Sequence, residues 1–223
     1  RLAGDFTVGA NTKPGVPGFP TIQAAVDALY QRGVRANVRF LLTDPFYAVG
    51  NTANVGSPAL DLSSNIIGIG PNSTVTWIAD PQSTGLSKAG VTIQLNSSNG
   101  IGVLLGQNTF PANFNAVQLE YPNKDNANSP GYMNFDGGAQ KSLKFQLRTF
   151  ANRRAVFYVG RRAYNNTIQN SIIELDPTTP ELDFWNTLPG VTIESNAFKF
   201  GADSTGFGAN FSTFTAGIFQ RNT

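Results

Sequence analysis

Only one segment of this sequence has the periodicity of an amphipathic helix. In residues 18–29, GFPTIQAAVDAL, the apolar positions recur at i, i+3, i+4 and i+7 and form one stripe of Ile22, Ala25, Val26 and Leu29. Thr21 stands where an N-cap hydroxyl accepts from a free N–H of the first turn, and Gly33 suits the left-handed position after the last turn. The sequence therefore predicts a single helix close to the start of the chain.

The rest of the chain is patterned as short strands separated by clusters of Asn, Gly, Ser, Asp and Pro. Segments of this kind, rich in β-branched and aromatic residues, predict strands. We expect strands at residues 1–9, 36–42, 65–70, 74–79, 91–95, 101–106, 116–121, 142–147, 155–160, 167–175, 191–200 and 215–220. No second helix is expected, so the predicted fold class is all-β.

Two all-β architectures fit this order of elements. In an antiparallel β-sandwich, tight hairpins join neighbouring strands, and Asn99-Gly100 between two expected strands is a typical hairpin dipeptide. In a parallel solenoid, each coil stacks its short strands on those of the preceding coil. We take the solenoid as the main prediction and the sandwich as the alternative.

Two segments in the C-terminal third favour the solenoid because they share one pattern. Residues 167–173, TIQNSII, align with residues 192–198, TIESNAF, at an offset of 192 minus 167, or 25 residues. In both, an apolar pair is followed by a polar corner with Asn, which tolerates left-handed backbone, and then by a second apolar pair. We interpret the two segments as equivalent parts of successive coils.

Composition excludes several kinds of site and partner. With Cys 0 and His 0, the chain has no disulfide, no thiolate or imidazole metal ligand, and no Ser-His-Asp or Cys-His catalysis. Charged residues make up 13% and the formal net charge is +2, which gives no broad electrostatic footprint for nucleic acid. No apolar run approaches the length of a transmembrane helix. We expect no nucleic-acid partner and no membrane span.

The first 42 residues resemble a known family. The segments that carry the resemblance are LAGDFTVG at 2–9, FPTIQAAVDALYQRGV at 19–34 and NVRFLL at 37–42. They are similar to the opening of right-handed parallel β-helix (pectin lyase-like) domains, of the kind found in large exported surface proteins of Bacteroidota and related bacteria. Phe6 replaces the Tyr usual in that first strand, and the usual Gly-Pro is missing from residues 35–40. The resemblance implies a right-handed solenoid opened by a strand and a capping helix.

Carbohydrate enzymes on this fold work with carboxylates, which makes the acidic residues the first candidates for catalysis. The richest acidic stretch holds Glu174, Asp176, Glu181 and Asp183, and we interpret it as a solvated loop. The motifs of polygalacturonases and the clustered aspartates of pectate lyases are missing. Residues 123–129, NKDNANS, offer oxygen ligands without the spacing of an EF-hand. We therefore predict no catalytic residue, no metal site and no cofactor.

One segment is a candidate for ligand binding. Residues 153–162, RRAVFYVGRR, place pairs of arginines at both ends of an apolar strand, and Arg and Tyr are frequent in binding hot spots. The candidate residues are Arg153, Arg154, Tyr158, Arg161 and Arg162. The competing interpretation is a buried strand whose flanking charges keep it soluble.

These observations predict one domain over residues 1–223, with the first strand and capping helix in 1–35 and the coils in 36–223. We expect it to be a segment of a longer extracellular or cell-surface protein with a structural or adhesive role. The alternatives are a polysaccharide lyase or hydrolase on the same fold and a protein similar to phage tailspikes. Because residues 211–220, FSTFTAGIFQ, are apolar and strand-like, we expect further coils, another domain or a neighbouring subunit at the C-terminal end. Glycans are a further expected partner.

Overall fold

The computed structural model describes residues 1–11, 13–53, 56–80, 90–105, 131–150, 155–159, 165–175, 192–200 and 209–210. Within these ranges the chain forms one helix, α1 (Ile22–Arg32), and a series of strands. The strands are β1 (Leu2–Val8), β2 (Gly18–Phe19), β3 (Val34–Leu42), β4 (Phe46–Gly50), β5 (Leu60–Leu62), β6 (Val75–Ala79), β7 (Val91–Ser97), β8 (Ile101–Leu105), β9 (Met133–Asp136), β10 (Leu143–Thr149), β11 (Ala155–Val159), β12 (Asn166–Leu175), β13 (Thr192–Phe200) and β14 (Ala209–Asn210).

Helix α1 lies where the sequence predicts it, and the predicted apolar stripe is buried. The Oγ1 of Thr21 accepts a hydrogen bond from the Ala24 N–H at 3.1 Å. After the last turn, the Gly33 N–H donates to the Leu29 carbonyl at 2.8 Å, and Gly33 has a φ of 63°. A Cβ at Gly33 would also overlap the carbonyl oxygen of Ile67. Glycine is therefore needed here for its backbone freedom and for its missing side chain.

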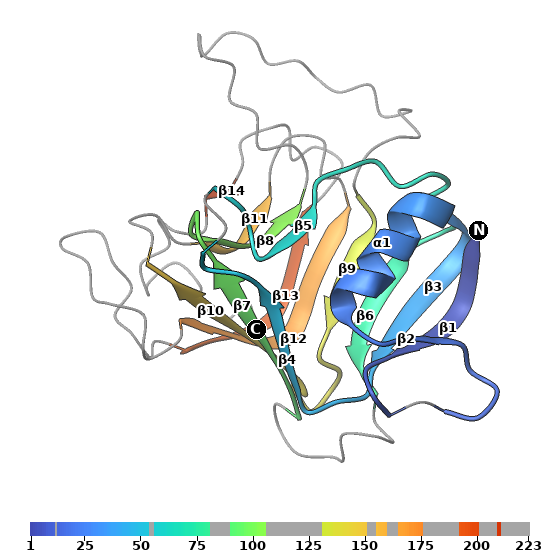
Figure 1. The fold of residues 1–223 in the computed structure, drawn as a ribbon, viewed down its shortest axis with the longest axis horizontal. Helices are drawn as coiled ribbons and strands as arrows, with labels where there is room; N and C mark the ends of the chain where they lie inside the picture. Colours follow the sequence, from blue (N-terminus) through green and yellow to red (C-terminus); the bar gives the residue numbers. More distant parts are fainter. Residues whose placement is uncertain are drawn as a thin grey trace, which may run out of the picture.

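The strands stack in successive circuits of the chain (Figure 1). Each of the first three circuits supplies three strands, in the order β3–β4–β5, β6–β7–β8 and β9–β10–β11. Each strand pairs in parallel with its counterpart in the next circuit. Strand β12 begins a fourth circuit and pairs with β9 along its first half and with β10 along its second half.

These pairings produce two sheets. The 10-stranded sheet has the order β2-β1-β3-β6-β9-β12-β10-β7-β4, with β13 also paired to β12, and the 4-stranded sheet has the order β14-β11-β8-β5. Figure 1 shows the large sheet curling round from β1 to β4, with the small sheet beside it. The described fold is thus all-β and mostly parallel with one helix, and the antiparallel sandwich is not supported.

Columns of apolar side chains, one from each circuit, fill the interior. The register aligns Phe40 with Trp77, Trp77 with Phe135 and Phe135 with Ile168. All four side chains are buried, and the rings of Phe40 and Trp77 lie 4.4 Å apart. Burying one such side chain contributes about 1.5–3 kcal/mol. Since side chains alternate along a strand, the residues between these face outward.

Asn99 and Gly100 form a corner between the two sheets, so the hairpin prediction is wrong. Strand β7, which precedes them, belongs to the large sheet, and β8, which follows, belongs to the small one. Gly100 has a φ of 84°, and the Asn99 Oδ1 accepts from the Ile101 N–H at 3.0 Å. Asn-Gly serves this corner for the same reason that it serves hairpins, since Gly reaches left-handed backbone and Asn bonds its local backbone.

The predicted asparagine corner in residues 167–173 is confirmed. Asn170 has a φ of 51° and lies in β12 between the half that pairs with β9 and the half that pairs with β10. Its Nδ2 donates to the Oδ1 of Asp136 at 3.0 Å. A single left-handed residue therefore turns the strand from one face of the stack to the next.

Residues 192–200 do not form the next parallel coil, so that interpretation of the repeat is wrong. They form β13, which runs antiparallel to β12, with Thr192 opposite Glu174 and Phe200 opposite Asn166. The predicted parallel coil would have placed Thr192 opposite Thr167. Alternation of apolar and polar residues looks the same in either strand direction, so the pattern did not determine the direction.

The remaining strand predictions are partly confirmed. Residues 65–70 form turns with one bridge from Gly70 to Ser73, and not a strand. Strands β4, β5 and β9 were not predicted, because they have only 5, 3 and 4 residues and lie between turn residues. The predicted strands at 116–121 and 215–220 lie outside the described residues.

Helix α1 meets the edge strands at the N-terminal end of the stack. It contacts β1 and also β2 and β4, which are the two edge strands of the large sheet. The Tyr30 hydroxyl donates to the backbone carbonyl of Asp61 in β5, the edge strand of the small sheet, at 2.9 Å. The helix thereby shields strand edges that would otherwise be open to pairing with another chain.

Candidate functional site

The outward surface of β4, β7, β10 and the second half of β12 carries aligned side chains, most of them polar, and we call it the amide face. Three columns cross it: Phe46, Thr92, Lys144 and Ile172; Ala48, Gln94, Gln146 and Glu174; Gly50, Asn96 and Arg148. The inward residues between them, such as Ile93 and Phe145, are buried in the core. Parallel strands lie about 4.8 Å apart, so the members of a column are close neighbours.

The charges of the amide face are largely neutralised within it. The Nε2 of Gln146 donates to the Oε1 of Glu174 at 2.9 Å, and the Lys144 Nζ lies 3.1 Å from the same oxygen. The Lys144 and Glu174 side chains are 27% and 12% exposed, so the ion pair lies against the sheet. Arg148 is exposed and leaves the face with a slight positive charge.

Two exposed aromatic rings flank the polar columns. Phe46 is 52% exposed at the start of β4, and Phe150 is 59% exposed directly after β10. Phe46 aligns with Thr92 and, through it, with Lys144 of β10. Phe150 follows Lys144 by six residues, so the two rings are about 20 Å apart along the strand direction. Beyond Phe46, strand β4 presents only the small residues Ala48 and Gly50 on this face. No large side chain of β4 therefore stands in front of the amides on β7 and β10.

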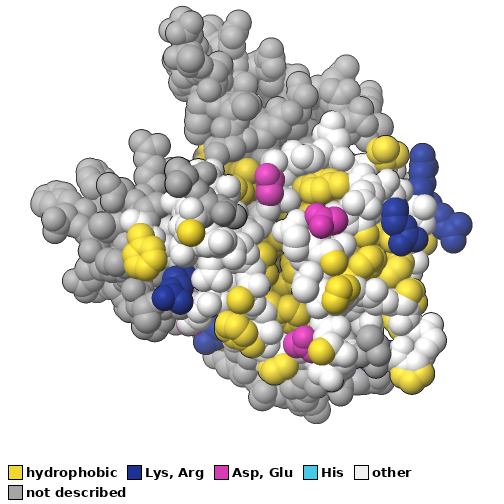
Figure 2. Space-filling view, viewed as in Figure 1, with side chains coloured by type: hydrophobic (Ala, Val, Ile, Leu, Met, Phe, Trp, Pro, Cys, Tyr) yellow, Lys and Arg dark blue, Asp and Glu magenta, His cyan; other side chains and the backbone are white. Residues whose placement is uncertain are grey.

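Charge is sparse on the described surface as a whole. On the face seen in Figure 2, a few scattered charged side chains lie among hydrophobic side chains, neutral polar groups and backbone, in line with 13% charged residues in the sequence. A surface of this kind recognises a ligand through hydrogen bonds and apolar contacts more than through ionic ones.

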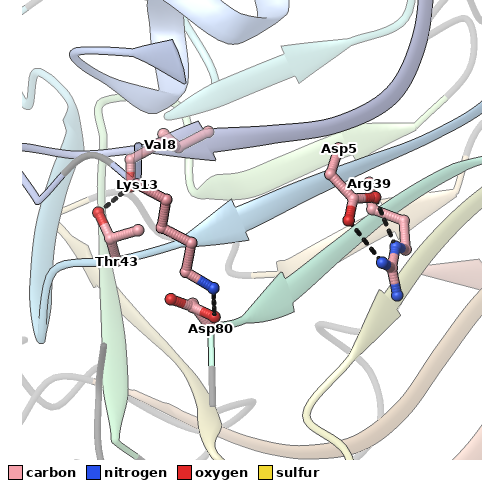
Figure 3. A network of polar contacts seen from close by, with 6 residues as sticks. All are labelled: Asp5, Val8, Lys13, Arg39, Thr43 and Asp80. Atoms are coloured by element: carbon pink, nitrogen blue, oxygen red, sulfur yellow. Dashed lines mark hydrogen bonds and ion pairs between the residues drawn. The ribbon is translucent and has the colours of Figure 1, made fainter. Parts of the chain in front are cut away.

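The ion pairs outside the amide face have structural roles (Figure 3). The Lys13 Nζ lies 2.7 Å from the Oδ1 of Asp80, whose side chain is 1% exposed, so this pair ties the loop before β2 to the second circuit. The Thr43 hydroxyl donates to the Val8 carbonyl at 2.9 Å and joins β1 to the end of β3. These contacts fasten one circuit to the next.

Asp5 and Arg39 form an ion pair across β1 and β3, also drawn in Figure 3. Two guanidinium N–H groups donate to the carboxylate at 2.8 and 2.6 Å. These hydrogen bonds, with the positive charge of Arg39, hold the pKa of the Asp5 carboxyl below its usual value.

Every carboxylate whose side chain the structure describes is bound to a neighbour. The partners are Arg39 for Asp5, Gln23 for Asp27, Ala10 and Asn11 for Asp44, Ser63 for Asp61, Lys13 for Asp80, Gly138, Gln169 and Asn170 for Asp136, and Lys144 and Gln146 for Glu174. An acid/base pair for glycoside cleavage needs two carboxyl groups about 5–10 Å apart across a groove. The described carboxylates form hydrogen bonds and ion pairs that connect corners, loops and neighbouring strands.

The predicted ligand-binding residues are described only in part. Arg153, Arg154, Arg161 and Arg162 lie outside the described residues, as do the other acids of the stretch that begins at Glu174 and the NKDNANS segment. Tyr158 is 7% exposed and packs with Leu104 and Ala155. Burial raises the pKa of its hydroxyl.

The amide face was missed by sequence reasoning, although three of its four strands, β7, β10 and β12, were predicted. VTIQLNS at 91–97 and LKFQLRT at 143–149 alternate clearly, and both place a Gln at the fourth position. Their alignment depends on the register of strands 52 residues apart, 146 minus 94, which alternation does not reveal. The outward Gln at the same position of two alternating strands is the signal that would have found it.

Neither a metal site nor a membrane helix emerges from the part of the chain that the structure describes. Those residues contain no group of three or more Asp or Glu side chains that could hold a metal ion, and no helix among them is long and apolar enough to cross a membrane. Comparison of the chain with protein-family models, with curated proteins and with solved structures found no match.

Proposed function

We propose that this chain is a right-handed parallel β-helix module that binds glycans without cleaving them, as a structural or adhesive part of an extracellular or cell-surface bacterial protein. Three stacked circuits of parallel strands, each closed by Asn- or Gly-containing corners, support the solenoid. The likeness of residues 1–42 to β-helix domains of exported surface proteins supports the setting.

The observation that carries the binding role is the amide face. A Gln or Asn side chain carries two donors and an acceptor with two lone pairs, a combination that matches the paired hydroxyl groups of a sugar. Phe46 and Phe150 supply apolar platforms for sugar rings, and the row between them has the length of an oligosaccharide. The Glu174 carboxylate is already bonded to Lys144 and Gln146. The face therefore offers hydrogen-bonding groups to a sugar, and we assign no general acid to it.

The proposal is tested by measuring binding to neutral and uronate-containing polysaccharides by affinity electrophoresis. The variant Gln94→Ala/Gln146→Ala removes two adjacent amides, and we expect at least a tenfold loss of affinity, since each lost hydrogen bond costs about 0.5–1.5 kcal/mol. The matched control is Thr76→Ala/Asn134→Ala, an outward pair on β6 and β9, outside the amide face, joined by a 3.4 Å hydrogen bond. We expect this control to bind like the unaltered chain.

Two results would reject the proposal. If neither class of polysaccharide is retained, or if both variants weaken binding equally, the amide face is not a glycan site. Release of new reducing ends or unsaturated sugars from any of these polymers would show an enzyme and reject the non-catalytic role.

A further inference from the structure

The last circuit of the stack has its outer edge covered by strands of opposite direction. Strand β13 pairs with β12 over the whole length from Asn166 to Glu174. The register is constant on both sides of Asn170, with Gln169 opposite Ala197 and Ser171 opposite Ser195. Strand β13 therefore follows β12 round the corner and covers its edge on two faces of the stack.

The third face shows the same reversal. Strand β14 pairs antiparallel with β11, with Tyr158 opposite Asn210 and Val159 opposite Ala209. All other strand pairs in the described residues are parallel, from β2–β1 to β10–β12. The direction changes only at the last circuit, where a further circuit would have to be added.

An antiparallel strand on this edge has a consequence for stacking. The edge of β12 presents one row of backbone N–H and C=O groups, and a strand that occupies it satisfies them. A further parallel circuit, or the first circuit of another molecule, needs the same row. The two arrangements exclude each other.

We propose that residues 192–200 and 209–210 form a fold-back cap on the last circuit that the structure describes, and that the β12 edge beneath residues 192–200 is a strand-accepting surface through which two copies of this chain associate once β13 is withdrawn. The partner that fits is the same strand, residues 192–200, of a second copy, because its register on β12 is already complementary. Exchange of an identical element is a low-cost route to a dimer. The inference is independent of glycan binding.

The absence of cysteine from the whole sequence allows a clean cross-linking test in the full chain. Thr167 stands opposite Lys199 in the observed register, and opposite residues of an antiparallel pair are within reach of a disulfide. We expect Thr167→Cys/Lys199→Cys to form a disulfide within one chain on mild oxidation. The control is Thr167→Cys/Thr192→Cys. These two positions would be neighbours only if residues 192–200 formed a parallel circuit, so we expect the two thiols to stay free.

The same variant tests association. With the 167–199 disulfide closed, we expect a monomer at every concentration in light scattering. Mixing the full-chain single variants Thr167→Cys and Lys199→Cys tests the exchange directly. We expect a disulfide from position 167 of one copy to position 199 of the other as concentration rises, because β13 of the second copy then occupies the β12 edge of the first. A disulfide in the control pair, or a Thr167→Cys/Lys199→Cys protein that is linked only between chains even at the lowest concentration, would overturn the fold-back cap. If the mixed single variants form no 167–199 disulfide at any concentration, or if the locked protein forms dimers, the strand-accepting edge is overturned.

Discussion

The two ends of the stack are closed by different means. At the N-terminal end, β1 and β2 continue the parallel direction, and α1 packs its buried stripe across the edge strands. At the C-terminal end, β13 and β14 reverse direction and occupy the edges of β12 and β11 with backbone pairing. The first closure depends on particular side chains, whereas the second depends on strand direction and register. The first should therefore be sensitive to single substitutions, and four of these measure how sensitive it is.

The largest effect is expected for Leu29→Ala in α1. Leu29 is fully buried in the main core, so truncation leaves a cavity and should lower the free energy of unfolding by about 2–5 kcal/mol. Urea titration followed by far-UV circular dichroism measures the loss. Gln31→Ala, on the exposed side of the same helix, should change it by less than about 0.5 kcal/mol. A loss below about 1 kcal/mol for Leu29→Ala would mean that helix packing does not hold this end.

Gly33→Ala should have the next largest effect. The new methyl group would overlap the Ile67 carbonyl at a residue with a φ of 63°. Gly15 is the matched control, since it has a φ of 76° and a methyl group added there would meet no atom within 4 Å. Both substitutions carry the cost of left-handed alanine, and Gly33→Ala should cost about 1–3 kcal/mol more because of the overlap. Equal thermal stabilities of the two variants would contradict a tight fit between the helix end and Ile67.

Tyr30→Phe removes the hydrogen bond from α1 to the edge of β5, and should cost about 0.5–1.5 kcal/mol at neutral pH. Burial, and to a lesser degree the Asp61 carboxylate, raises the pKa of the Tyr30 hydroxyl above its usual value of 10.0. A raised pKa contributes stability below the unfolded-state value that is lost as pH increases beyond it. The difference between the unaltered chain and Tyr30→Phe should therefore shrink above about pH 10 in denaturant titrations. A constant difference from about pH 7 to 11 would contradict this assignment.

The smallest effect is expected for Asp5→Asn, which removes the ion pair between β1 and β3. The pair is largely exposed, so its loss should cost only about 0.2–1 kcal/mol at neutral pH. Because Arg39 lowers the pKa of Asp5, the contribution is present above the ordinary value of 3.8 and is lost as pH falls through the folded-state value. Thermal melts should converge for the two proteins near about pH 2. A larger effect than that of Tyr30→Phe would mean that strand pairing, more than the helix, holds this end.

Much of the N-terminal end could be predicted from the sequence, although β2 was not. Helix boundaries, the Thr21 cap, the Gly33 position and the buried stripe all follow from local periodicity and capping chemistry. The C-terminal end could not be predicted in this way, because residues 192–200 have the same alternation whether they run parallel or antiparallel. The short strands β5 and β9 were missed because three or four residues do not establish a period.

The candidate site was the least predictable feature. The sequence directed attention to the arginines around Tyr158, a residue that is buried in the structure. The amide face instead brings Gln94 and Gln146 together from strands of different circuits, and their proximity depends on insertions of unequal length between circuits. No local rule relates residues separated in this way.

The sequence by itself determined the class of the fold, the helix over Ile22–Arg32 and the position of the asparagine corner at residue 170, because each depends on interactions within a few residues. Only the tertiary structure decided which strands are neighbours, that those of the first three circuits run parallel, and that the last strand reverses. The reason is physical: alternation assigns each side chain to the inside or the outside, whereas direction and register depend on how distant backbone edges pair. The two ends of the stack show these two levels of information side by side.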